Sequence, residues 1–324
     1  MRRAFLWAGL LQVGLIAYTI LPGQSTEAVK LPPAIPVAEG DGFPVFQQLK
    51  ETIRISSNHY ADLVLDQDGN SWVASFFKGL DGDDRIYITR VNLQGKQDFV
   101  FDGLTNGRAT AVTVDEKGNA YVTGWFKGAL PLVNSHFPSN EPQTFIARIN
   151  GSSLKCDQFW TGSAQGLPFD ICSNQAGKIL LMGGRDGDLE WDGQRLSLQE
   201  TDEQGFLAIF SDDLECQVLR AFDARVHQTI PGPDQSFLVG GSFCKPFSFS
   251  GQTIETAEEG DQDGFVMLLQ PNGQLEWINL IGNKQAAPYG YRSPEAVTDL
   301  KYDSTRKEIL VAHPREPSRW SSNK

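Results

Sequence analysis

The chain has 324 residues, 40% of them hydrophobic and 21% charged, which is the balance of a folded globular protein rather than a disordered one. Its 32 glycines and 17 prolines indicate many turns, and long helix-forming stretches are few, so a helical protein is excluded. The formal net charge of −12 repels phosphate backbones and anionic lipids, and we therefore expect no nucleic-acid partner.

The N-terminal residues predict export. Two arginines precede an apolar run over residues 4–21, which Pro22 ends, and the small residues Ser25 and Ala28 follow. This order is typical of a secretory signal, although the run is almost long enough to span a bilayer as an uncleaved anchor. Both alternatives place the rest of the chain outside the cytoplasm, secreted, periplasmic or at the cell surface. Only residues 4–21, if uncleaved, would contact a membrane.

Two hairpins with the same sequence pattern follow. Residues 63–74 are echoed by residues 112–123, and in both copies an apolar run ends at an Asp/Gly turn before a second apolar run begins. Alternating β-branched and aromatic residues around such turns are typical of β-hairpins. Each copy continues into an aromatic-Phe-Lys-Gly tetrapeptide, at residues 76–79 and 125–128. The two strands of each hairpin are called A and B.

A second pair of strands, C and D, follows each hairpin. In the first copy they cover residues 86–92 and 99–101, and in the second copy residues 145–150 and 159–160. The alternation in strand C puts successive side chains on opposite faces of a sheet. The repeating unit is therefore expected to be a four-stranded antiparallel sheet.

Two weaker copies extend the repeat. Their strands B, C and D are expected at residues 179–184, 205–210 and 218–219 and at residues 237–243, 264–269 and 274–278. The glycine of the A–B turn advances from Gly69 to Gly118 to Gly177, in steps of 49 and 59 residues. Those steps match the blade of a β-propeller and exceed the period of leucine-rich or ankyrin repeats.

The two ends of the repeat region predict a fifth, composite blade. Residues 297–303 and 309–312 match strands A and B, whereas residues 41–46 and 52–55 match strands C and D. Strands from both termini would close the ring and remove two unpaired sheet edges. We therefore predict an all-β fold, a propeller of five four-stranded blades. The expected boundaries are a signal peptide or anchor at 1–28, a Pro-rich linker at 29–40, the propeller at 41–313 and a C-terminal tail at 314–324.

The repeat resembles a bacterial β-propeller repeat family of exported and cell-surface proteins. The residues that carry the resemblance are Asp-x-x-Gly-Asn-x-Tyr-Val-Thr-Gly-x-Phe at 115–126 and Phe-Ile-Ala-Arg-Ile-Asn at 145–150. The resemblance covers about residues 41–313, and it departs at residues 304–307, which replace the Asp-Gly-Asn turn. It implies a fold and a location, but no activity, because that family is defined by its scaffold.

Four cysteines occur in the chain, and an even number in an exported protein predicts two disulfides. Three pairings are possible. We expect Cys156–Cys172 and Cys216–Cys244, because each pair would join one blade to the next and close a short loop of the chain. No CxxC pair is present, so zinc and thioredoxin-like chemistry are not expected.

The B–C loops are acidic and supply the candidate binding residues. They should emerge on one face of the ring, where they would form either a calcium or cation site or simply a solvated acidic rim. Trp191 lies in the long loop 185–204, outside the repeated aromatic positions, and is a candidate contact residue. The binding candidates are Asp81, Asp83, Asp84, Asp186, Asp188 and Trp191.

Two functions remain open. The chain contains no GxSxG, P-loop or GxGxxG motif, which favours a non-enzymatic binding or scaffolding propeller with a protein or carbohydrate ligand. The alternative is a glycoside hydrolase or transferase that uses carboxylates near the ring axis. Asp62, Asp170 and Asp299 lie on the expected innermost strands, and the alternative requires at least two of them to converge on one pocket.

Overall fold

The computed structural model describes residues 62–79, 82–130, 135–136, 141–162, 166–185, 187–197, 205–222, 224–255, 262–281, 296–312 and 318–321. The expected signal segment, the linker and the strands at 41–55 lie outside these residues. Among the described residues, no helix has the length and apolar character needed to cross a bilayer.

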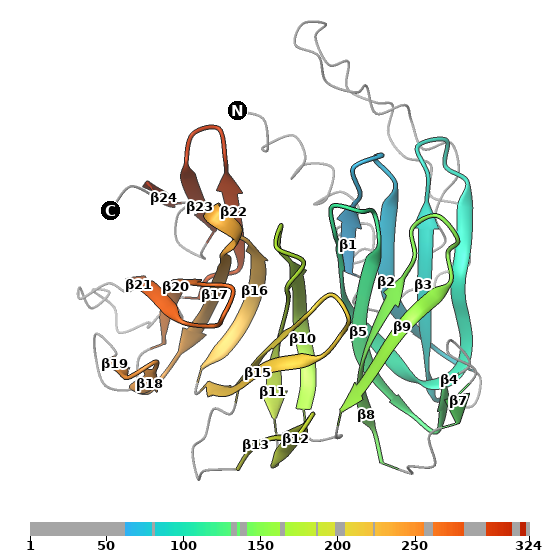
Figure 1. The fold of residues 1–324 in the computed structure, drawn as a ribbon, viewed down its shortest axis with the longest axis horizontal. Coiled ribbons are helices and arrows are strands. Elements are labelled where there is room, and N and C mark those ends of the chain that lie inside the picture. Colours follow the sequence, from blue (N-terminus) through green and yellow to red (C-terminus); the bar gives the residue numbers. More distant parts are fainter. Residues whose placement is uncertain are drawn as a thin grey trace, which may run out of the picture.

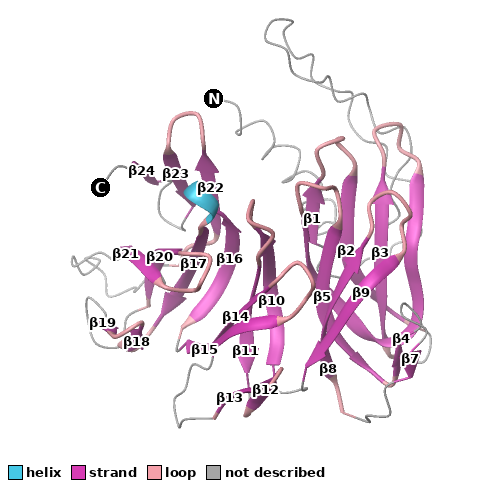
Figure 2. Ribbon diagram, viewed as in Figure 1, coloured by secondary structure: helices cyan, strands magenta, loops and turns pink. Residues whose placement is uncertain are grey.

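The described chain is all-β and is built from repeated four-stranded antiparallel sheets (Figures 1 and 2), here called blades. Each blade is a meander of strands A to D. The third blade contains β10 (Gly166–Ser173), β11 (Ile179–Arg185), β14 (Gly205–Phe210) and β15 (Cys216–Phe222). The fourth contains β16 (Arg225–Pro231), β17 (Phe237–Phe243), β20 (Asp263–Leu269) and β21 (Leu275–Ile281).

The first two blades share one long strand and form a continuous seven-stranded sheet. This strand, β4 (Gln97–Val114), pairs first with β3 as strand D of blade 1 and then with β5 as strand A of blade 2. The other strands are β1 (Asp62–Leu65), β2 (Ser71–Lys78), β3 (Asp84–Val91), β5 (Ala120–Lys127), β8 (Gln143–Ile149) and β9 (Cys156–Gly162).

Short hairpins are inserted between strands B and C of blades 2, 3 and 4, and the sequence did not predict them. They are β6 (Ala129–Leu130) with β7 (Ser135–His136), β12 (Leu189–Trp191) with β13 (Gln194–Leu196), and β18 (Phe247–Phe249) with β19 (Gln252–Ile254). Apolar side chains of each hairpin, such as Leu130, Trp191 and Phe249, are buried against the blades.

The last described sheet has three strands: β22 (Asp299–Asp303), β23 (Glu308–Ala312) and β24 (Ser318–Ser321). β24 pairs with β23, with Ile309 opposite Trp320. Residues expected to form a tail therefore occupy the strand C position, which we had assigned to residues 41–46. The composite blade as first predicted is wrong at this edge, because a chain segment close in sequence takes the place.

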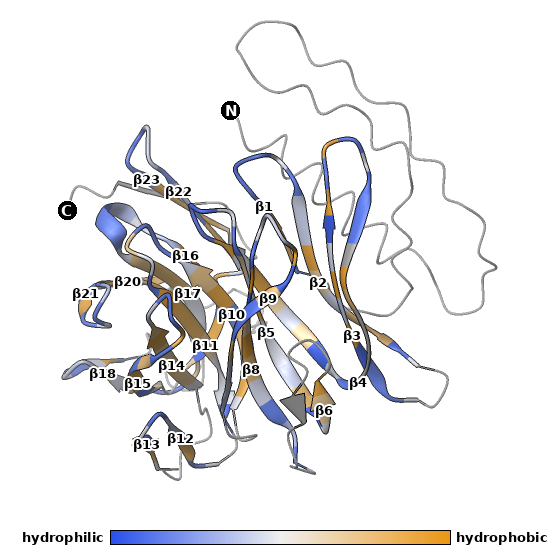
Figure 3. Ribbon diagram, turned by 45° about the vertical axis from the view of Figure 1, so that its right-hand side comes forward, coloured by the Kyte–Doolittle hydropathy of each residue, from blue (hydrophilic) through white to orange (hydrophobic). Residues whose placement is uncertain are grey.

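Apolar side chains of neighbouring blades pack into one core layer between each pair of sheets, and Figure 3 shows hydrophobic residues running along the central strands. Alternate residues of β11 illustrate this, because Leu181 packs toward blade 2 and Leu180 toward blade 4. Every residue of β14 and β17 is buried. Central strands therefore read as continuous apolar runs, since both of their faces are covered.

A bulge recurs in the inner strands of blades 2, 3 and 4, between Ala109 and Ala111 in the first case and at equivalent positions in β10 and β16. At each bulge a carbonyl of strand A lies over a glycine of strand B. A Cβ on Gly183 would stand 2.1 Å from the carbonyl oxygen of Leu167, and Gly124 and Gly241 are equally tight. Only glycine permits this approach, so these glycines fix the bend of the inner strands.

Candidate functional site

The inner strands of successive blades lie next to one another: β1 by β4, β4 by β10, β10 by β16 and β16 by β22. One repeat position, counted from the A–B turn, is equivalent in all the inner strands, and in blades 2 to 4 it comes directly after the bulge. Its occupants are Asp62, Ala111, Asp170, Gln228 and Asp299. The three carboxylates predicted on innermost strands therefore occupy one structurally equivalent position.

Side chains at this position bond to the next inner strand. Asp62 Oδ2 accepts a hydrogen bond from the Val112 backbone N–H at 2.7 Å. Asp170 Oδ2 accepts from the Thr229 backbone N–H and from Thr229 Oγ1, the latter at 3.0 Å, and Gln228 Oε1 accepts from the Leu300 N–H. Both aspartates also accept from the following residue of their own strand. These side chains act as staples between blades.

The environment shifts the titration of both carboxyls. Burial raises the pKa of Asp62 even though two backbone N–H groups oppose the shift. Burial, followed by the charge of Asp62, raises the pKa of Asp170 to about 8. A protonated acid beside a second carboxyl is the arrangement that a glycosidase uses. Here, however, both oxygens of each carboxyl already accept hydrogen bonds from the inner strands. These contacts indicate that the two carboxyls hold neighbouring strands together.

The acidic B–C loop candidates do not converge in the described part of the chain. Asp81 and Asp186 lie outside it, and Asp83 is exposed. Asp84 is 5% exposed and forms ion pairs with Lys78 at 2.8 Å and Arg108 at 2.5 Å. Although burial alone would raise its pKa, hydrogen bonds from these two cations hold the pKa of Asp84 below its ordinary value.

Asp188 pairs with Arg195 at 2.9 Å on the surface. Among the described residues, no group of three His, Cys, Asp or Glu side chains is placed to hold a metal ion. The structure therefore gives the calcium hypothesis no support from the residues that it describes, and Asp84 and Asp188 have basic partners instead.

Trp191 lies in the core between blades 2 and 3 rather than on an exposed loop. It is 1% exposed, and its ring meets those of Trp160 and Phe206 edge-on, with centroids 4.9 Å apart in both cases. The expectation of a contact residue is wrong because the loop 185–204 contains the β12–β13 hairpin. That hairpin turns its apolar face onto the blades, and the Asp192 carboxylate in its turn accepts from Trp160 Nε1.

The predicted disulfides do not form: the four cysteines, all in described segments, make no disulfide with one another. Cys156 packs against the core between blades 1 and 2, whereas Cys172 belongs to the core between blades 3 and 4. Cys216 belongs to the intervening core, between blades 2 and 3. Cys156, Cys172 and Cys216 thus face three different layers, and the expected Cys156–Cys172 pair fails because sequence spacing did not reveal which layer each thiol faces.

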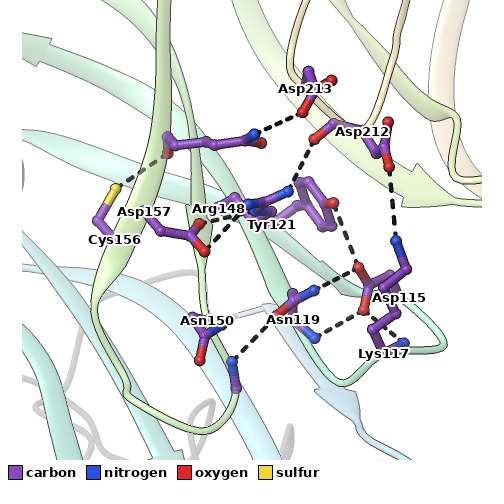
Figure 4. A network of polar contacts seen from close by, with 12 residues as sticks. Asp115, Lys117, Asn119, Tyr121, Arg148, Asn150, Cys156, Asp157, Asp212 and Asp213 are labelled. Carbon is purple, nitrogen blue, oxygen red and sulfur yellow. Dashed lines mark hydrogen bonds and ion pairs between the residues drawn. The ribbon is translucent and has the colours of Figure 1, made fainter.

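A polar network joins blades 2 and 3 at their outer strands (Figure 4). Arg148 binds Asp157 on its own blade at 2.8 Å and donates to the backbone oxygen of Asp212 on the next blade at 3.2 Å. Arg90, its counterpart in blade 1, likewise donates to Gly151 O of blade 2 at 2.6 Å. The signal for this network was present in the sequence, since both arginines precede an apolar residue and an asparagine in strand C.

No family model and no curated protein sequence matches the chain. Solved structures similar to it include Raptor from Chaetomium thermophilum, with a TM-score of 0.41 and 12% identity over 83% of this chain and 24% of that one. Drosophila Semaphorin 2a gives a TM-score of 0.40 and 8% identity over 82% and 54%. Virginiamycin B lyase from Staphylococcus aureus gives 0.31 and 12% over 79% and 92%. The chain spans about a quarter and about half of the first two, and at these scores the likenesses say nothing about its activity.

Proposed function

We propose that this protein is an extracytoplasmic, non-enzymatic binding or scaffolding propeller whose ligand is a protein or a carbohydrate. The observation that carries the proposal is the use of Asp62, Asp170 and Gln228 as hydrogen-bonding staples between inner strands. The hydrogen bonds join the blades, and side chains held in this way are poorly placed to protonate or attack a substrate. The outer rim and the loops remain as the surface for recognition.

The proposal includes a five-bladed ring and export by the N-terminal segment. Because β24 supplies strand C of the last blade, residues 52–55 would supply its strand D alone and then continue into β1. This order repeats the way in which β4 passes from strand D of one blade to strand A of the next. The resemblance to exported propeller repeats and the apolar run at 4–21 support a location outside the cytoplasm.

The test compares the wild-type protein with the Asp62→Asn and Asp170→Asn variants. Each is incubated with a panel of glycosides while released reducing ends are measured. Binding to an array of the same glycans, and crosslinking to envelope proteins, are measured in parallel. We expect no turnover and equal binding by all three proteins. Turnover by the wild type that both variants lose would refute the proposal in favour of the glycoside hydrolase.

A further inference from the structure

A shallow cavity of about 480 Å³, wide open to the surface, lies between blades 3 and 4, and it is lined by Arg220, Ser250, Gln274 and Leu275. Arg220 lies on β15, the outer strand of blade 3. Ser250 lies in the turn of the β18–β19 hairpin, and Leu275 begins β21. Two blades therefore build the cavity, and three of its four lining side chains are polar.

The arginine is held in place by its neighbours in blade 4. Arg220 Nη1 donates to Ser250 Oγ at 3.2 Å and to the Gly273 backbone oxygen at 2.9 Å. Both contacts use the same nitrogen. The Nε and Nη2 groups share the other edge of the planar guanidinium, which is the edge that matches the two oxygens of a carboxylate.

The equivalent junction between blades 2 and 3 has a different pair of side chains in contact. There Trp160, at the position of Arg220, donates to the carboxylate of Asp192, at the position of Ser250. Asp192 and Ser250 both adopt a positive φ before a glycine, so the two turns have the same geometry. Blade 4 thus presents a neutral hydroxyl to a cation, where blade 3 presents an anion to an indole.

Several other described arginines have an acidic partner within the protein. Arg90 pairs with Asp98, Arg148 with Asp157 and Arg195 with Asp188. Arg220, by contrast, contacts only neutral oxygens among the described residues. In a chain of net charge −12, such an arginine at a cavity is a candidate anchor for an external anion.

We propose that the cavity binds a carboxylate carried by a sugar acid, with the Nε–Nη2 edge of Arg220 as the anchor. The hydroxyl of Ser250 and the amide of Gln274 would then meet sugar hydroxyls, and Leu275 the apolar face of the ring. The volume is sufficient for a small saccharide. This inference deepens the proposed binding function and rests on it.

The test follows the Nε–H signal of Arg220 in the ¹⁵N-labelled protein during titration with glucuronate. The signal is assigned by its loss in Arg220→Gln. We expect a saturable shift with half-saturation at about 1–10 mM, the range for one charge-assisted contact to a small polar ligand. Acetate should shift the signal more weakly, and glucose not at all. Arg220→Gln should weaken glucuronate binding, followed by backbone signals of 273–275, at least tenfold.

Arg148→Lys is the matched control, because it alters another arginine at a blade junction, and it should bind glucuronate as the wild type does. The proposal is overturned if up to about 50 mM glucuronate produces no saturable shift, if glucose acts equally, or if inorganic sulfate binds more tightly. The wild-type titration decides the matter even if Arg220→Gln does not fold. If folded Arg220→Gln still binds glycans, this site alone is refuted. If the wild-type protein binds neither a glycan of the array nor an envelope protein, the proposed function itself is refuted.

Discussion

Replacing Asp170 by asparagine should stabilise the protein at neutral and alkaline pH. The substitution keeps an oxygen that can accept from Thr229, whose N–H and hydroxyl both donate to Asp170 Oδ2. It removes the charge, whose cost in the folded state is expressed in the pKa of about 8. It also replaces Oδ1, which accepts from the Ile171 N–H at 2.9 Å, with an amide group that cannot accept. The variant therefore separates the staple from the carboxylate.

The direction of the pH dependence follows from the raised pKa. Between about pH 4 and pH 8 the folded protein keeps a proton on Asp170 that the unfolded chain releases, so the free energy of unfolding falls as pH rises through this window. A pKa difference of this size, from 3.8 to about 8, sets a ceiling of ~6 kcal/mol at 1.4 kcal/mol per unit. Because Asp170 as a whole residue is only half-buried and Asp62 titrates with it, we expect ~1–3 kcal/mol.

Urea unfolding of wild type and Asp170→Asn, followed by tryptophan fluorescence at pH 4 and pH 8.5, measures the effect. The variant should be more stable at pH 8.5, whereas at pH 4 the lost acceptor of the Ile171 N–H should leave it about 0–1 kcal/mol less stable than wild type. Asp170→Ala is the matched comparison, since it leaves the Thr229 N–H without its acceptor and should lose about 1–3 kcal/mol relative to Asp170→Asn at both pH values. An Asp170→Asn protein that is less stable than wild type at pH 8.5, or a difference independent of pH, would refute the reasoning.

Three further outcomes test other parts of the structure. Arg148→Ala should lower the free energy of unfolding by about 1–3 kcal/mol, because it removes the contact to Asp212 O between blades and leaves Asp157 without its partner; urea denaturation measures it, and a loss no larger than for Arg148→Lys would contradict this role. Trp191→Ala should lower the free energy of unfolding by about 3–5 kcal/mol, because it leaves a cavity in the core. The same urea denaturation measures it, and a variant as stable as wild type would contradict the burial of Trp191. Burial raises the thiol pKa of Cys156 and Cys216 to about 12 and that of Cys172 well above its ordinary value. These thiols of the native protein should therefore react with DTNB about 100-fold more slowly than free cysteine until urea exposes them. Rapid labelling of the native protein would contradict this.

The blades could be predicted because each strand carries its own signal. Turn glycines such as Gly69 and Gly118 adopt a positive φ and mark the ends of strands. In the strands between these turns, successive side chains point to opposite faces of the blade. The inserted hairpins could not be predicted in this way. Strands of two or three residues are too short to repeat the two-residue alternation that marks a strand. Their burial depends on the neighbouring blade.

The layer that a side chain faces was the information missing from the sequence. Cys156 and Cys172 are close along the chain but pack into core layers two blades apart. Trp191 was predicted to be a contact residue because it lies outside the repeated aromatic positions. It lies outside them because it belongs to an inserted hairpin. The inner-strand acids were placed correctly, but Gln228 was missed because a search for catalytic groups considers carboxylates alone.

The variety of residues at the inner-strand position argues that selection there acts on hydrogen bonding rather than on acid chemistry. A hydrolase requires a carboxyl group, whereas a staple requires only an acceptor, and Gln228 serves as well as Asp170. Where Ala111 offers no acceptor, Thr113 Oγ1, two residues later on the same face of β4, accepts from the Ser173 N–H at 3.2 Å. The bond has moved by two residues along both strands, which keeps the blades joined but would displace a catalytic group by more than 6 Å. Recognition by this protein is therefore expected at the rim, where the residues between blades differ in charge as well as in type.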